Sequence, residues 1–300
     1  IIMVGFGSIG QGILPLILRH IGVTADRITI LTAEESGRAE AEGYGVRFEV
    51  SPLDRGNYRA LLEPRLSRGD FLLNLSVDVS SLALVELCRE RGALYLDTCI
   101  EPWPGGYTDP GISMARRTNY ALREEALKLR TPKGTPKGTP KGGAPTAVLT
   151  HGANPGLVSY FVKQALLNIA ADTGAGGAEP RSRAEWAQLA RRLGVKVVHI
   201  AERDSQVTNK PKRMNEFVNT WSVDGFVSEG AQPAELGWGT HERNFPADGH
   251  RFDFGPGCAI YLNRPGASTR VRTWTPRAGH FHGFLITHGE SISIADYYTV

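Results

Sequence analysis

Residues 1–12 read IIMVGFGSIGQG, and this stretch decides the fold class. An apolar run ends at Gly5, after which Gly7 and Gly10 complete a G-x-G-x-x-G spacing in front of a helix-like segment. In a strand–turn–helix unit the first glycine allows the tight turn, the second lets a pyrophosphate approach the backbone, and the third packs the helix on the strand. The N–H groups at the start of the helix then face the phosphates. We therefore expect Gly5, Gly7, Ser8, Ile9 and Gly10 to bind a dinucleotide.

The rest of the first half alternates strand-like and helix-like segments. Apolar strand-like runs occupy residues 27–33, 70–77 and 93–100, and helix-like patterns occupy residues 9–22, 58–66, 80–92 and 118–130. Such alternation is typical of a parallel sheet covered by helices. The sequence therefore predicts an α/β fold in which residues 1–150 form a Rossmann-type, doubly wound NAD-binding domain.

The expected cofactor is NAD, and several residues near strand ends are candidates to bind it. An acidic residue about twenty positions beyond the glycines holds the ribose hydroxyls in such domains, and Glu34 or Glu35, just after Thr32, stands nearest to that place. No arginine lies between residues 28 and 37 to accept a 2′-phosphate, which favours NAD over NADP. Ligands bind beyond the carboxyl ends of the strands. At those ends Asp78, Ser80, Asp97 and Thr98 are further candidates for the cofactor, and Glu101 is a candidate for the substrate. The alternative for Asp78 and Asp97 is an ordinary loop or cap position. Cys99 is better explained as a small buried residue than as a nucleophile.

A low-complexity segment separates the two halves. Residues 131–142 repeat TPKG, and proline and glycine at this frequency predict a flexible loop, with phosphate binding by Lys133, Lys137 and Lys141 as the less favoured alternative. After it, THGANPG is expected to lead into a helix with Asn154 as N-cap and Pro155 as first residue.

The second half, residues 151–300, is expected to form a substrate domain of α+β type. Ser182 caps a predicted helix that Gly194 ends. Strand-like patterns follow at residues 195–202, 217–223, 258–263, 270–275 and 280–298, which predicts a largely antiparallel sheet. The last pattern runs up to Val300, so we expect the chain to continue beyond it.

Composition excludes several classes of protein. Apolar residues make up 41% and charged residues 22%, and no apolar run is long enough to span a membrane. Three cysteines without a CxxC spacing argue against a disulfide framework and a structural zinc site. The net charge of +3 is too small and dispersed for a nucleic-acid surface. We expect a cytoplasmic protein with a small-molecule partner, no membrane partner, no nucleic-acid partner and no metal.

Acidic and aromatic residues in the second half favour a diamine substrate. Carboxylates would bind its ammonium ends, and tryptophan is the best side chain for a cation–π contact. Glu202, Trp221, Glu229 and His288 are the candidates, and a hairpin at residues 224–225 would bring Trp221 close to Glu229. Taken singly, each residue is better explained by packing or exposure. A basic run favours a carboxylate substrate instead: Arg203, Lys210, Lys212 and Arg213. His280 and His282 could bind a metal together with His288, but packing is the favoured interpretation.

Five segments together resemble the bacterial homospermidine synthases, relatives of the saccharopine dehydrogenases. They are VGFGSIGQG, LLNLSVDVSS, YLDTCIEPW, THGANPG and NTWSVDGFVSEG, and the last two are the most specific. The chain departs from the family in the longer TPKG repeat and in ending well before the family's chains do.

The resemblance implies a homodimeric transferase of polyamine biosynthesis. Putrescine gives a hydride to NAD and becomes an imine, which loses ammonia to water or to a second putrescine. The resulting Schiff base with the second putrescine takes the hydride back to give homospermidine. Spermidine is a further implied amine. By resemblance Glu101, Asn154 and Glu229 hold the reacting amines, with Asn154 also near the cofactor, and Glu202 anchors a distal ammonium. Trp221 makes a cation–π contact, and His288 assists proton transfer or substrate orientation.

Two other readings stay open. In an ordinary saccharopine-type or amino-acid dehydrogenase, NADH would accumulate with turnover, and an arginine would bind the substrate carboxylate. In a non-catalytic NAD-sensing protein, the Rossmann domain would bind the nucleotide without chemistry.

Overall fold

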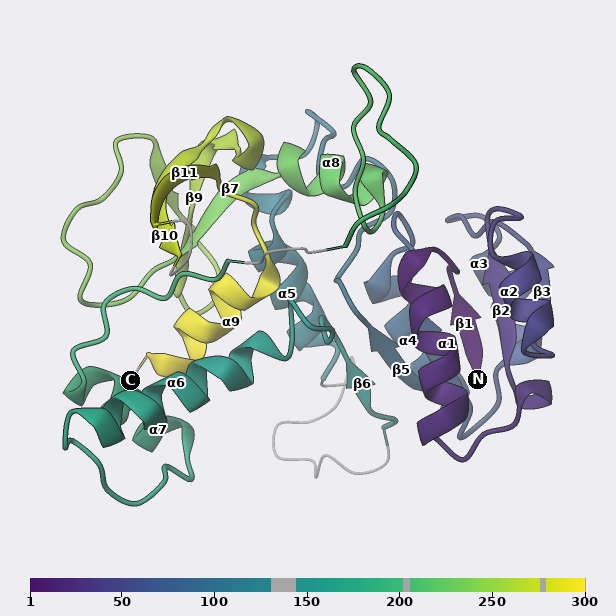
Figure 1. Cartoon of the computed structure of the whole chain (residues 1–300), viewed down its shortest axis with the longest axis horizontal. Helices are drawn as coiled ribbons and strands as arrows, with labels where there is room; N and C mark the ends of the chain where they lie inside the picture. Colours follow the sequence, from purple (N-terminus) through teal and green to yellow (C-terminus); the bar gives the residue numbers. More distant parts are fainter. Residues whose placement is uncertain (131–143, 202–205, 276–278, 300) are drawn as a thin grey trace. The chain divides into compact units, whose positions relative to one another are not determined.

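The structure is a computed structural model that describes residues 1–130, 144–201, 206–275 and 279–299 (Figure 1). The chain divides into two compact units, each built from three segments. The first unit comprises Ile1–Gly106, Leu122–His151 and Gln206–Val227, and the second comprises Tyr107–Ala121, Gly152–Ser205 and Ser228–Val300. The TPKG repeat and Glu202 lie outside the described residues. Within the described residues, no helix has the length and apolar character needed to cross a membrane.

The first unit contains a six-stranded sheet in the order β3-β2-β1-β4-β5-β6, in which every neighbouring pair is parallel. This order confirms the predicted doubly wound parallel sheet. The short polar strand β3 has no counterpart in the sequence prediction. The strands are β1 (Ile2–Val4), β2 (Thr29–Thr32), β3 (Arg47–Val50), β4 (Phe71–Asn74), β5 (Leu94–Asp97) and β6 (Ala147–Val148).

Helices cover both faces of this sheet because the side chains of each strand alternate between two cores. On one face Met3 and Leu73 pack with Leu14 of α1 (Ser8–His20) and Ala41 of α2 (Arg38–Gly43). On the other face Ile2, Val4 and Leu72 of the strands pack with the helices α3 (Tyr58–Leu62) and α4 (Ser81–Arg91). Figure 1 shows these helices around the strands.

The second unit confirms the predicted α+β class. Its strands form two antiparallel sheets, one of three strands in the order β7-β9-β8 and one ribbon of β10 and β11. The strands are β7 (Pro233–Gly237), β8 (Gly249–Arg251), β9 (Ala259–Pro265), β10 (Arg270–Thr275) and β11 (Gly279–Phe284). The helices that lie wholly within this unit are α6 (Val158–Asp172), α7 (Arg183–Arg192) and α9 (Gly289–Tyr298), whereas α5 (Asn119–Lys128) and α8 (Val223–Ala231) each contribute residues to both units.

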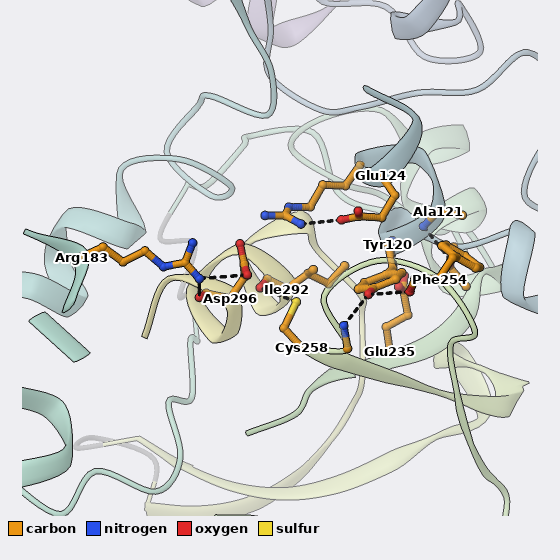
Figure 2. Close-up of polar contacts among 12 residues, drawn as sticks. Tyr120, Ala121, Glu124, Arg183, Glu235, Phe254, Cys258, Ile292 and Asp296 are labelled. Atoms are coloured by element: carbon orange, nitrogen blue, oxygen red, sulfur yellow. Dashed lines mark hydrogen bonds and ion pairs between the residues drawn. The ribbon is translucent and has the colours of Figure 1, made fainter. Parts of the chain in front are cut away.

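Side-chain hydrogen bonds fix the ends of several second-unit elements. Ser182 caps α7 in a capping box with Glu185, as the sequence predicts, and Gly194 follows the helix with a φ of 68°. Figure 2 shows Arg183, the first residue of α7, bonded to Asp296 near the end of α9. It also shows Tyr120 donating to the carbonyl oxygen of Phe254 at 3.0 Å.

Three local predictions are wrong. The predicted hairpin at residues 224–225 is the start of helix α8, because the hydroxyl of Ser222 accepts the N–H of Gly225 at 3.0 Å and caps the helix. Residues 280–298 are not one strand: β11 ends at Phe284 and α9 begins at Gly289, with Ile292 buried against Cys258 and Ala259. No strand forms among the described parts of 195–201 and 217–222.

The predicted N-cap of α6 is also wrong. The helix begins at Val158 with Leu157 as its N-cap, because residues 152–157 form a turn in which Gly152 donates to the carbonyl of Pro155 at 2.7 Å and Leu157 donates to that of Gly152 at 2.9 Å. Asn154 therefore lies in a loop that precedes the helix, and its side chain is left to make a different contact.

Candidate active site

The glycine-rich turn of the first unit has the geometry that a dinucleotide requires. Gly5 has a φ of 85°, a left-handed conformation that favours glycine, and a Cβ at this position would lie 2.8 Å from the amide nitrogen of Ser76. The third glycine, Gly10, is buried, and a Cβ there would lie 2.9 Å from the ring of Phe6. The glycine at position 5 therefore lets the turn pack closely on the chain that follows β4. The glycine at position 10 lets helix α1 pack closely on the turn.

The middle glycine leaves open space instead. Gly7 is the N-cap of α1, and a Cβ built on it would meet no atom within 4 Å. Ser8 and Ile9, the first helical residues, are exposed. The turn also lies where β1 pairs with β4, the point at which the strand order reverses. An open backbone position at a helix N-terminus and at the switch point fits the pyrophosphate of a dinucleotide.

The residues expected near the ribose lie at the end of β2. Thr32 is buried as the last residue of that strand, whereas Glu34 and Glu35 are exposed. Glu35 forms a two-pronged ion pair with Arg38, whose guanidinium also lies 4.7 Å from the ring centroid of Phe48. Arg38 is therefore already paired within the protein. At this strand end Glu35 is bound by Arg38, whereas no ion pair is found for Glu34 among the described residues.

The other predicted cofactor residues occupy the ends of β4 and β5. Asp78 is exposed with a φ of 61°, and the hydroxyl of Ser80 accepts the N–H of Ala83 at 3.4 Å as the N-cap of α4. Thr98 is half-buried. Glu101 is buried, and its backbone N–H donates to the hydroxyl of Ser81 at 3.0 Å.

Asp97 is fully buried, and its carboxyl group is bound by its neighbours. One oxygen accepts the N–H of Thr150 at 2.6 Å, and the other accepts the hydroxyl of Tyr95 at 2.8 Å. Burial raises the pKa of Asp97 to about 6, although these hydrogen bonds favour the charged form. These contacts join the end of β5 to the residues that follow β6.

Two of the predicted substrate features, Trp221 and the basic run at residues 210–213, belong to the first unit. Trp221 is half-buried just before α8, with its ring centroid 6.1 Å from that of Phe226 in an edge-on contact. Lys210, Lys212 and Arg213 are exposed. Arg203 lies outside the described residues, as does Glu202.

A cluster of polar side chains surrounds His288 in the second unit. His288 is the N-cap residue of α9, and its Nδ1 lies 3.0 Å from the amide oxygen of Asn154. Its Nε2 lies 3.1 Å from a carboxylate oxygen of Glu229, which α8 supplies. The structure thus brings together three of the predicted substrate residues, although they lie far apart along the chain.

Glu290 joins this cluster and was not among the predicted residues. Its carboxylate lies 3.5 Å from Nδ1 of His288, and the side chain is buried in the first turn of α9. Its Oε2 atom has no hydrogen-bond partner within the described part of the chain. A helix prediction for residues 289–298 would have placed Glu290 beside His288 at a helix start, where acidic residues are favoured.

The cluster keeps His288 positively charged. Burial alone would lower the pKa of His288, but the hydrogen bonds and charges of Glu229 and Glu290 outweigh it and raise the pKa to about 10. Both ring nitrogens then carry protons, one facing Asn154 and one facing Glu229. With two carboxylates around one imidazolium, the cluster is net negative and suited to bind an ammonium group and to give or take a proton.

The described residues provide no metal site. No group of three or more histidine, cysteine, aspartate or glutamate residues is arranged to hold a metal among them. His280 and His282 are exposed on β11 rather than packed as expected, because the ribbon of β10 and β11 leaves that side uncovered by other described residues.

Comparisons with known proteins point to the same family for both halves of the chain. Residues 1–136 match the model of the saccharopine dehydrogenase NADP binding domain, and residues 152–300 match that of the saccharopine dehydrogenase C-terminal domain. Proteins named homospermidine synthase from Blastochloris viridis and Mesorhizobium japonicum are 56% identical over 303 residues and 51% identical over 305 residues. These matches cover all of this chain but 62% and 61% of the relatives, so the chain spans less than two thirds of their length.

A solved structure gives the same relation. The crystal structure of the homospermidine synthase from Legionella pneumophila, in complex with NAD, matches this chain with a TM-score of 0.83 and 48% identity. The match covers 100% of this chain and 61% of that one.

The charge state of His288 can be measured directly. We expect NMR of the imidazole nitrogens to show His288 doubly protonated at pH 8, since its pKa is about 10 in the native state. Because this pKa is raised above the ordinary 6.5, its contribution to folding stability is fully present below pH 6.5 and is lost as the pH rises to about 10.

Substitution of Glu229 tests whether its carboxylate raises the pKa of His288. Glu229→Gln should lower the pKa of His288 by about one unit or more, because a carboxylate at hydrogen-bond distance favours the charged form by that amount. The control is Glu179→Gln, an exposed glutamate of the same unit, which should leave the titration unchanged. A native His288 that titrates near 6.5 would contradict the described cluster.

Proposed function

This chain belongs to the saccharopine dehydrogenase family, and from that premise we propose that it acts as a homospermidine synthase with NAD as its cofactor. Two putrescine molecules combine to homospermidine and ammonia, so the reaction has no net redox change. The observation that carries the proposal is the anionic cluster of His288, Glu229, Glu290 and Asn154, which is suited to an amine substrate.

The glycine-rich turn supports the choice of cofactor. The open position at Gly7 and the free helix N-terminus at Ser8 would hold the pyrophosphate, and Glu34 would accept the ribose hydroxyls. When bound, NAD supplies the capacity to accept a hydride from an amine-bearing carbon and to return it. Asp97 would act from within the sheet, by fixing the chain around Thr150 rather than by touching the nucleotide.

The second-unit cluster would handle protons and positive charge. An amine must lose a proton before its carbon can release a hydride, and ammonia must gain one to leave. Glu229 would bind one ammonium group, and the Oε2 atom of Glu290, which has no hydrogen-bond partner among the described residues, would bind another. His288 would hold a proton at Nε2 against Glu229 and pass it to the departing nitrogen, while the amide of Asn154 keeps the ring oriented.

The remaining substrate residues complete the proposal by family resemblance. Glu101 would bind a reacting amine, Glu202 would anchor the distal ammonium, and Trp221 would stabilise the positive charge by a cation–π contact worth about 2 kcal/mol when desolvated. Putrescine is the proposed main substrate, spermidine a second amine, and the assembly a homodimer in the cytoplasm.

Turnover with limiting cofactor tests the function. We expect the protein, mixed with putrescine and substoichiometric NAD, to form homospermidine and ammonia in equal amounts that exceed the NAD supplied. The cofactor cycles, so NADH should not accumulate. NADH rising in step with putrescine loss would mean a net dehydrogenase, and binding of NAD without any product would mean a nucleotide-binding protein.

Trp221 tests the cation–π contact. Trp221→Phe should lower the turnover of putrescine moderately, because phenylalanine keeps a weaker aromatic face, and Trp221→Ala should lower it severely. The matched control is Trp238→Phe, which changes a tryptophan packed against Phe245 in the second unit. Steady-state kinetics of ammonia release provides the measurement, and unchanged values in both Trp221 variants would remove this residue from the site.

A further inference from the structure

A cavity lies at the edge of the parallel sheet where its strands begin. Its volume is about 670 Å³, within the usual range for small-molecule sites. Three arginines line it: Arg68, Arg89 and Arg91. Its lining also includes three apolar residues: Leu94, Ala144 and Pro145.

This cavity is separate from the glycine-rich turn. Its lining residues immediately precede β4, β5 and β6, so they lie at the amino ends of three adjacent parallel strands. Gly5 and Gly7 follow the carboxyl end of β1 in the same sheet. Because the strands are parallel, the two places are on opposite edges of the sheet, and one ligand cannot occupy both.

The arginines of the cavity lack acidic partners in the part of the chain that the structure describes. None of the three forms an ion pair within the residues that the structure describes. The acidic residue in the lining, Glu90, is bound instead by Arg59 through two hydrogen bonds of 2.7 and 3.0 Å. That ion pair lowers the pKa of Glu90. The cavity therefore gathers positive charge that the described chain leaves uncompensated.

Two of the guanidinium groups are held in place by backbone carbonyls. Arg89 donates one N–H to Leu129 at 2.9 Å, and Arg91 donates its Nε–H to Leu66 at 3.0 Å. Each guanidinium has five N–H donors, so most of them remain available. Arg68 forms no hydrogen bond through its side chain in the described chain and lies over Gly92, where a Cβ would come within 3.3 Å of its Cγ.

We propose that this cavity binds an organic anion with at least two phosphate or carboxylate groups. The planar forks of three arginines match oxyanions of this kind, and a single charged group would leave most of the donors unused. The apolar residues Leu94, Ala144 and Pro145 contact the uncharged body of the ligand. The site lies at the edge opposite the glycine-rich turn, so a ligand there leaves that turn open.

Calorimetric titration tests the site with defined probes. Inorganic pyrophosphate and citrate are titrated separately into the protein at constant ionic strength, with saturating NAD present so that the glycine-rich turn is filled. We expect one saturable site per chain, weakened about tenfold or more by Arg68→Gln, since a charge-assisted hydrogen bond contributes that much. The fold should tolerate this substitution, because the Arg68 side chain makes no hydrogen bond in the described residues.

The matched control is Arg47→Gln, an exposed arginine at the start of β3, outside the cavity. It removes the same charge and should leave the affinity unchanged. Tighter binding of pyrophosphate identifies the natural ligand as a phosphate compound, and tighter binding of citrate identifies it as a polycarboxylate. Absence of saturable binding for both probes, or equal weakening by both variants, would overturn the proposal.

Discussion

The imidazolium of His288 is the charge on which the second unit's chemistry depends. It lies between the carboxylates of Glu229 and Glu290 and holds the amide oxygen of Asn154. Removal of the proton would leave the buried side chains of Glu229 and Glu290 without the cation beside them, which is costly in a buried site. The cluster therefore fixes both the charge of the site and the positions of the three chain segments that meet there: the loop before α6, the helix α8 and the start of α9.

In the first unit the main constraint is that backbone groups stay accessible to a ligand. Its parallel sheet is buried on both faces, so ligands can reach it only at the strand ends. At one edge glycines expose the backbone of the turn after β1, and at the other edge arginines surround a cavity. Asp97, buried at the carboxyl end of β5, stabilises the sheet itself because its carboxylate accepts the N–H of Thr150.

The sequence predicts best what depends on local chemistry. The spacing of Gly5, Gly7 and Gly10 predicts a tight turn at the first glycine, open space at the second and close helix packing at the third. All three features are present in the structure. The capping box at Ser182 is similarly local. The alternation of apolar strands and helices then suffices for the parallel sheet, because few arrangements bury both faces of such strands.

The cluster around His288 depends on contacts that local patterns do not specify. Asn154 and Glu229 lie 134 and 59 residues from His288 along the chain. Family resemblance named these three residues, yet their mutual contacts and the part of Glu290 came only from the fold. The wrong strand predictions for residues 217–223 and 280–298 have a common cause, because both segments are rich in β-branched and aromatic residues that favour strands. In the structure the Ser222 cap stabilises helix α8, and the burial of Ile292 stabilises helix α9.

The central claim is that the hydride taken from one amine returns to the product. It is tested most directly with putrescine that carries deuterium at both carbons bearing nitrogen, incubated with the protein and unlabelled, substoichiometric NAD. The account predicts homospermidine that retains all of the deuterium of its two precursors, as measured by mass spectrometry. Product that has lost one deuterium per molecule, or label that accumulates in the reduced cofactor, would contradict it.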